Sequence, residues 1–166
     1  MYKRQLVDGS QKLRKHAIIT SCRAKGKIVS KDEKELGNRA LLNFGHTFGH
    51  ALEAETGFGE KLLHGEAVSI GMMMAFDLSV QIGTCSPKDA GRVKAHLTSM
   101  GLPIRPADIP DQTWCSETLL SHMAQDKKVH KGKMTFILTR GIGDTFITSE
   151  VDTTEVKALL AQAIAV

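Results

Sequence analysis

Apolar residues recur at helical spacing along most of this chain, and that periodicity constrains the fold more than any other feature. Apolar stretches bounded by capping residues or glycine predict helices over about 10–27, 39–56, 64–82, 86–100 and 117–125. The sequence shows no strand–helix alternation and no G-x-G-x-x-G motif, so we expect no Rossmann unit within it.

The period changes near the C-terminus. Two stretches, 134–139 and 145–150, flank the turn RGIGD and predict a β-hairpin. Asp152 and Glu155 then form a capping pair for a last helix. The sequence therefore predicts a mainly α fold, with a helical bundle and one short hairpin, in a single domain over 1–166.

Composition narrows the classes of partner. The net charge is +4, but Lys and Arg are spread along the chain without an aromatic platform, so nucleic acid is not expected. The charge is compatible with a small anionic substrate or simply with a solvated basic surface. The three cysteines are widely spaced and form no C-x-x-C, which indicates a reducing compartment. No apolar leader is present, and the longest apolar stretch, 67–76, is too short to span a bilayer. We therefore expect a cytoplasmic protein without a membrane partner.

The most informative helix carries an unusual polar stripe. At about 100° per residue, one face of the predicted helix 39–56 presents a single row of polar side chains. That row consists of Arg39, Asn43, His46, His50 and Glu53. A solvated helix face usually carries Lys, Glu, Gln and Ala, so an arginine, an asparagine and two histidines favour a binding or catalytic role.

His46 and His50 lie one helical turn apart, so their side chains are neighbours. Such a pair can share a metal ion, or one imidazole can bind the metal while the other moves a proton. The alternative is that both simply lie on a polar face. Gly45 and Gly49 count against that alternative, since a glycine inside a helix costs about 1 kcal/mol relative to alanine. Close approach of another helix or of a ligand would explain them.

A third histidine, His64, begins the next predicted helix, whose nearly chargeless sequence indicates a central place in the core. The connection GFGEKLL is short enough for the two helices to pack antiparallel, which would bring His64 beside His46, with His50 one turn further. His64 is either a satisfied core residue or a metal ligand. Glu66 beside it is either a partner for that ligand or an acid that favours the helix start.

The segments LNFGHTFGHALE and LLHGEAVSIGM, with their flanks, strongly resemble the 3-dehydroquinate synthase family over nearly the whole chain. Neighbouring sugar-phosphate cyclases share parts of these motifs. The resemblance implies conversion of 3-deoxy-D-arabino-heptulosonate 7-phosphate to 3-dehydroquinate and phosphate, in the shikimate pathway of aromatic amino acid biosynthesis. It also implies NAD, a divalent metal (Zn²⁺ or Co²⁺) and a homodimer.

The same resemblance implies roles for individual residues. His46 and His64 are expected to bind the metal, and His50 to assist proton transfer as a catalytic residue alongside Glu35. Substrate contacts are expected from a further set of polar positions. These are Lys25, Arg39, Asn43 and the lysine pair Lys127 and Lys128, of which either lysine can supply the contact.

In the family, the third metal ligand (a glutamate) and the NAD-binding domain precede the region that this chain resembles. A catalytic zinc site needs three protein ligands and an open position, so we expect the chain to be inactive alone. Three hypotheses remain: the C-terminal part of a 3-dehydroquinate synthase, a portion of another sugar-phosphate cyclase, or a non-catalytic helical module that binds metal or dimerises.

Overall fold

The structure, a computed structural model, describes residues 10–34, 37–125 and 134–165. The chain divides into two compact units, one ending at Leu42 and the other beginning at Asn43, and each is described by itself. The expectation of a single domain over 1–166 stays a prediction.

In the first unit, helix α2 runs over Gln11–Val29, close to its predicted bounds. It begins after Ser10, although the Ser10 side chain makes no capping hydrogen bond. None of its residues is buried. Beyond the helix, the Asp32 carboxylate accepts hydrogen bonds from the backbone N–H groups of Gly37 (2.8 Å) and Arg39 (3.0 Å). These bonds hold the backbone at Gly37 and Arg39 to the Asp32 side chain.

The predicted continuous helix over 39–56 is wrong in its first half. A 3₁₀ helix, η1, covers Asn38–Asn43, and the α-helix α3 covers only His46–Glu55. The break falls at Gly45, whose φ of +84° lies in the left-handed region that favours glycine. The polar stripe is therefore divided, because Arg39 and the histidines do not share a helix.

The two glycines of this segment lie where another helix approaches closely. That helix is α4, His64–Gln81. A Cβ on Gly49 would lie 3.1 Å from the Ala67 carbonyl oxygen, and a Cβ on Gly45 would lie 2.6 Å from the Met72 nitrogen. The prediction that close approach explains the glycines is confirmed, and the approaching group is the α4 backbone.

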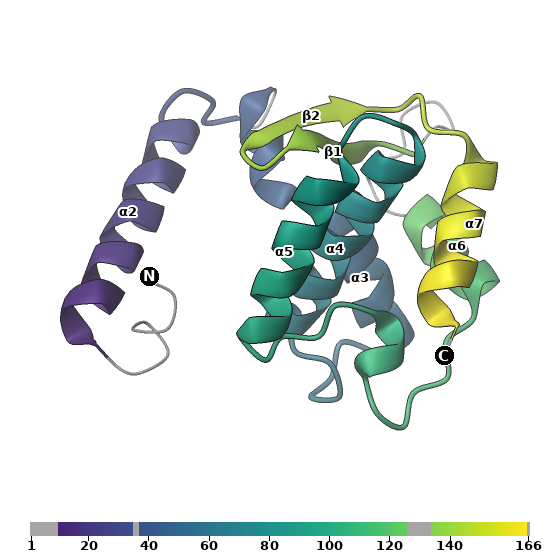
Figure 1. Cartoon of the computed structure of the whole chain (residues 1–166). Helices are drawn as coiled ribbons and strands as arrows, with labels where there is room; N and C mark the ends of the chain where they lie inside the picture. The colour runs from purple at the N-terminus through teal and green to yellow at the C-terminus, as the bar shows by residue number, and fades with distance from the viewer. Residues whose placement is uncertain (1–9, 35–36, 126–133, 166) are drawn as a thin grey trace. The chain divides into compact units, whose positions relative to one another are not determined.

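Helix α4 occupies the centre of the second unit, as its nearly chargeless sequence predicts. Ten of its 18 residues are buried. It contacts α3, α5 (Pro87–Ser99), α7 (Thr153–Ile164) and β1 (Phe136–Gly141). Figure 1 shows α4 between α5 and α3. Helix α4 is thereby packed against other elements on several sides.

The predicted β-hairpin is confirmed. β1 pairs antiparallel with β2, Asp144–Thr148. The buried backbone N–H of Thr139 donates to the Ser79 hydroxyl at 3.1 Å, which attaches the hairpin to the end of α4. α6, Ser116–Gln125, and α7 complete the main core together with α3, α4 and β1. The fold is mainly α with one late hairpin, as expected.

A short 3₁₀ helix, η2 (Pro106–Asp108), is fixed by one carboxylate. Asp108 accepts hydrogen bonds from the backbone N–H groups of Ile104 (2.9 Å) and Arg105 (3.0 Å) and from the Arg105 guanidinium (3.2 Å). Desolvation raises the pKa of Asp108, but these hydrogen bonds outweigh it and hold the pKa below its ordinary value.

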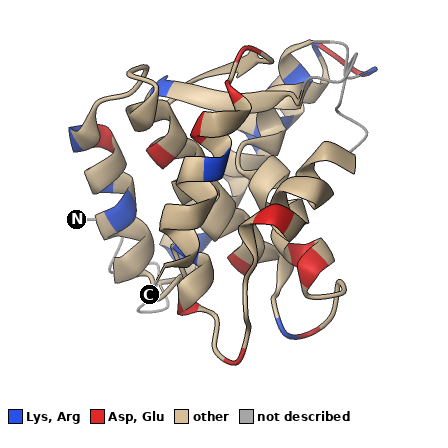
Figure 2. Cartoon of the chain, turned by 90° about the vertical axis from the view of Figure 1, so that its right-hand side faces the viewer, with Lys and Arg blue, Asp and Glu red and all other residues tan. Residues whose placement is uncertain are grey.

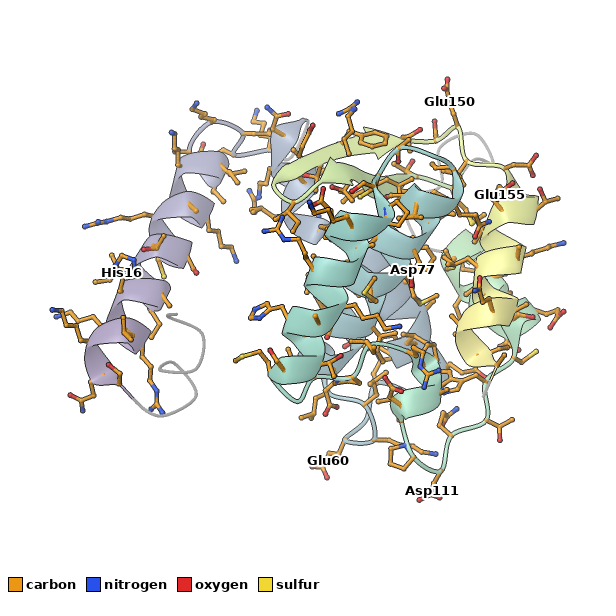
Figure 3. All side chains as sticks on the ribbon, in the orientation of Figure 1. His16, Glu60, Asp77, Asp111, Glu150 and Glu155 are labelled. Carbon is orange, nitrogen blue, oxygen red and sulfur yellow. The ribbon has the colours of Figure 1, made fainter. Side chains whose placement is uncertain are left out.

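A groove of about 470 Å³ opens between the end of α4, α5 and α7, and Asp77 and Lys94 line it. Asp77 is labelled in Figure 3. Desolvation raises the pKa of Asp77, although the nearby Lys94 ammonium opposes the shift. With a rise of 1.5 Å per residue, Asp77 lies about 20 Å along α4 from His64, so the groove is separate from the histidines.

Two general features of the described part of the chain are its distribution of charge and the apolar length of its helices. Figure 2 shows acidic and basic positions interspersed along the ribbons. None of the described helices combines the length and apolar character needed to cross a membrane.

Candidate metal centre

The candidate site lies where α3 and α4 pack together. His46 is the first residue of α3, His50 follows one turn later, and His64 is the first residue of α4. Gly45 lies against Gly71 near the start of α3, while the end of α3 meets the start of α4. The helices therefore run antiparallel, as expected, and their packing brings the three imidazoles together.

The three imidazole rings form a compact cluster. The ring centres of His46 and His64 are 5.4 Å apart, those of His46 and His50 are 5.3 Å apart, and those of His50 and His64 are 6.4 Å apart. Two imidazoles on one tetrahedral zinc, with Zn–N bonds of about 2.0–2.1 Å, have ring centres about 5 Å apart. The separation of His46 and His64 therefore suits a shared ion.

Hydrogen bonds at Nδ1 orient two of these rings. His64 Nδ1 lies 3.0 Å from Glu53 Oε1, and His46 Nδ1 lies 3.4 Å from the Phe44 carbonyl oxygen. Both partners are acceptors, so each Nδ1 carries the proton. In a neutral ring, Nε2 is then the nitrogen that carries the lone pair, and neutral imidazole suits zinc or cobalt.

The donor set fits a divalent cation but is incomplete by itself. Within the described ranges, no group of three His, Cys, Asp or Glu side chains has the arrangement needed to hold an ion. His46 and His64 could supply two nitrogen donors, so a further ligand would have to come from elsewhere.

Glu53 is the residue whose role the sequence did not reveal. It lies on the polar stripe, but its partner His64 belongs to another helix, so spacing alone does not connect them. Glu66 was the open alternative as that partner. Instead, the Glu66 carboxylate accepts from the Leu63 backbone N–H at 3.0 Å and stabilises the start of α4.

The remaining predicted residues are placed only in part. Lys25 is exposed on α2 in the first unit. Arg39, in the same unit, donates from its guanidinium to the Glu33 carbonyl oxygen at 2.5 Å. Asn43, the last residue of η1, begins the unit that holds the histidines.

Three predicted site residues lie outside the described part of the chain. They are Glu35, Lys127 and Lys128. Their assigned roles stay predictions, as does the choice between the two lysines.

Comparison with known proteins decides the family. Residues 2–129 match the family described as 3-dehydroquinate synthase C-terminal. The chain belongs to the 3-dehydroquinate synthase family. A 3-dehydroquinate synthase from Rhodospirillum rubrum is 55% identical over 161 residues, covering 96% of this chain and 42% of the relative. One from Jannaschia sp. is 50% identical over 160 residues, covering 96% and 43%.

Solved structures share the fold of this synthase-family chain. A 2-epi-5-epi-valiolone synthase from Streptomyces hygroscopicus subsp. jinggangensis 5008, with NAD⁺ and Zn²⁺ bound, matches with a TM-score of 0.77 and 25% identity, covering 93% of this chain and 41% of its own. A 2-deoxy-scyllo-inosose synthase, complexed with carbaglucose-6-phosphate, NAD⁺ and Co²⁺, matches with a TM-score of 0.73 and 23% identity, covering 85% and 40%. The chain thus spans about two fifths of the length of its relatives.

Proposed function

We propose that this chain is the metal- and substrate-binding part of an active 3-dehydroquinate synthase. The complete enzyme would convert 3-deoxy-D-arabino-heptulosonate 7-phosphate to 3-dehydroquinate and phosphate, as a lyase of the shikimate pathway. The observation that carries this proposal is the cluster of three imidazoles, 5.3–6.4 Å apart, in a chain 55% identical to a protein of that name.

In this proposal, His46 and His64 hold a Zn²⁺ or Co²⁺ ion through their Nε2 atoms. The third ligand, a glutamate, and most of the NAD site belong to the rest of the protein. When bound, the cation supplies Lewis acidity toward a substrate hydroxyl, and NAD accepts and returns a hydride.

His50 has a different proposed role, which is to move a proton. Its ring centre lies 5.3 Å from that of His46, so a substrate group beside the metal ligands would be within its reach. Imidazole side chains are common general acids and bases, since one ring nitrogen can accept a proton and the other can donate one. Glu35 is the proposed second catalytic group.

The substrate carries a phosphate and a carboxylate, and fixed cations are needed to bind both. We propose Lys25, Arg39 and one of Lys127 and Lys128 for this role, with Asn43 as a neutral hydrogen-bonding partner. An arginine fork suits either anion because it can donate two parallel hydrogen bonds. The net charge of +4 is in keeping with an anionic substrate.

Another cyclase activity is the competing proposal. The solved cyclases are 23–25% identical to this chain, whereas proteins named 3-dehydroquinate synthase are 50–55% identical. This difference favours the heptulosonate phosphate as substrate. We further propose a cytoplasmic homodimer.

Phosphate release by the full-length protein, supplied with NAD and Co²⁺ or Zn²⁺, tests the proposal. We expect turnover of 3-deoxy-D-arabino-heptulosonate 7-phosphate and none of a seven-carbon sugar phosphate that lacks the carboxylate. The reverse preference would favour another cyclase. The 166-residue chain alone should release no phosphate, and turnover by it would contradict the proposed division of the site.

A further inference from the structure

The contact between Glu53 and His64 joins the end of α3 to the first residue of α4. Glu53 Oε1 lies 3.0 Å from His64 Nδ1, and the two side chains are exposed to very different extents, 12% for Glu53 and 60% for His64. A largely exposed imidazole is therefore attached to a largely buried carboxylate. Solvent-facing imidazoles otherwise rotate among several rotamers.

The contact fixes the ring chemically as well as sterically. An ionised carboxylate can only accept hydrogen bonds, so the proton of neutral His64 belongs on Nδ1. Nε2 is then the nitrogen with a free lone pair. A carboxylate behind a metal-binding imidazole sets its tautomer and orientation and increases its basicity as a ligand.

Stability alone is a poor explanation for this pair. An exposed ion pair contributes about 0–1 kcal/mol, and His64 is exposed. Glu66 already stabilises the start of α4 through the Leu63 N–H, so Glu53 is not needed there. What Glu53 does add is a defined ring orientation beside His46, whose ring centre is 5.4 Å from that of His64.

We propose that Glu53 is a positioning residue that holds His64 in the Nδ1–H tautomer with Nε2 directed to the metal. This inference rests on the proposed function, because it assumes that His64 binds the ion. It adds a residue to the site that does not itself touch the ion.

The chain offers a matched control on the same helix. Glu55 Oε2 lies 3.0 Å from His122 Nε2, so Glu55 joins α3 to α6 by the same kind of contact. Its side chain is 19% exposed, similar to that of Glu53. Glu55→Ala removes an equivalent contact without touching the three-histidine cluster.

The test uses the full-length protein and its Glu53→Ala, Glu53→Gln and Glu55→Ala variants. In the metal-free protein, long-range ¹H–¹⁵N spectra report which ring nitrogen of His64 carries the proton, with His64→Ala assigning the signals. Co²⁺ affinity is then measured from visible absorption bands in competition with a chelator. Circular dichroism checks that each variant is folded.

We expect Glu53→Ala to weaken Co²⁺ binding by about 10–100-fold and to abolish the preference for the Nδ1–H tautomer. Glu53→Gln, whose amide oxygen still accepts, should keep the tautomer and recover part of the affinity. Glu55→Ala should leave both unchanged. Unchanged tautomer and affinity in Glu53→Ala would overturn this inference alone, provided that His46→Ala abolishes binding. A wild-type protein without Co²⁺ affinity would overturn the metal site itself, and this inference with it.

Discussion

Gly71→Ala tests whether the close packing of α3 on α4 determines the site. A Cβ on Gly71 would lie 2.0 Å from the Gly45 carbonyl oxygen and 2.9 Å from the Gly49 nitrogen. Close carbon–oxygen contacts are about 3.3–3.6 Å. The helices would therefore have to separate by more than about 1 Å, because the obstructing atoms belong to the backbone and have no alternative rotamer.

The expected magnitude is a difference between two opposing effects. Alanine is favoured over glycine in a helix by about 1 kcal/mol, whereas overpacking a core costs about 1–3 kcal/mol and occasionally more. A backbone clash belongs at the upper end of that range. We expect Gly71→Ala to lower the free energy of unfolding by about 2 kcal/mol, because the overpacking cost exceeds the gain in helix propensity by about that amount.

Denaturant unfolding followed by circular dichroism measures this effect, and Gly91→Ala is the control. Gly91 lies inside α5, and a Cβ there would meet nothing within 4 Å. Gly91→Ala should therefore raise the free energy of unfolding by up to about 1 kcal/mol. Gly71→Ala should also weaken Co²⁺ binding, since separating the helices moves His46 away from His64. A Gly71→Ala protein as stable as Gly91→Ala would refute the close approach.

Three further predictions concern other groups. Substituting His46 or His64 by Ala should abolish Co²⁺ binding in a spectrophotometric titration. His50→Ala should weaken Co²⁺ binding less, while still reducing turnover. Equal loss of Co²⁺ binding in all three variants would contradict the separate role of His50. Because the pKa of Asp108 is lowered in the fold, its stabilisation is present above the unfolded value of about 3.9 and is lost as pH falls through the folded value. Asp108→Asn should thus lower the urea midpoint at pH 7, and by less at pH 3. Because the pKa of Asp77 is raised, its charge opposes folding at pH 7, so Asp77→Asn should raise the midpoint at pH 7 and leave it nearly unchanged at pH 3.

The sequence predicted the helices because each carries its own periodicity and boundaries. The start of α4 at His64 and the bounds of α5, predicted over about 86–100, follow from local features, and the structure confirms both. The break at Gly45 was not predictable in this way. Residues 39–56 keep a helical period across that position, and only contact with α4 shows why the backbone turns left-handed there.

The same distinction applies to the site. His46 and His50 were found by their spacing, since one helix places them side by side. Their approach to His64 was expected from the short connection, and the structure confirms that approach, whereas the metal role of these residues stays a proposal. The contact of Glu53 with His64 joins different helices, and no spacing rule connects them. For such pairs, sequence alone provides the residue types without their partners.

The glycine contact and the Glu53–His64 contact act on opposite ends of α3. Gly45 meets Gly71 at one end and Glu53 meets His64 at the other. The two contacts are eight residues apart on α3, about 12 Å at 1.5 Å per residue. Two contacts so far apart determine both the spacing and the axial register of the helices. Two proposed ligands would then already be in place before a third group arrives, so metal binding would cost less conformational entropy.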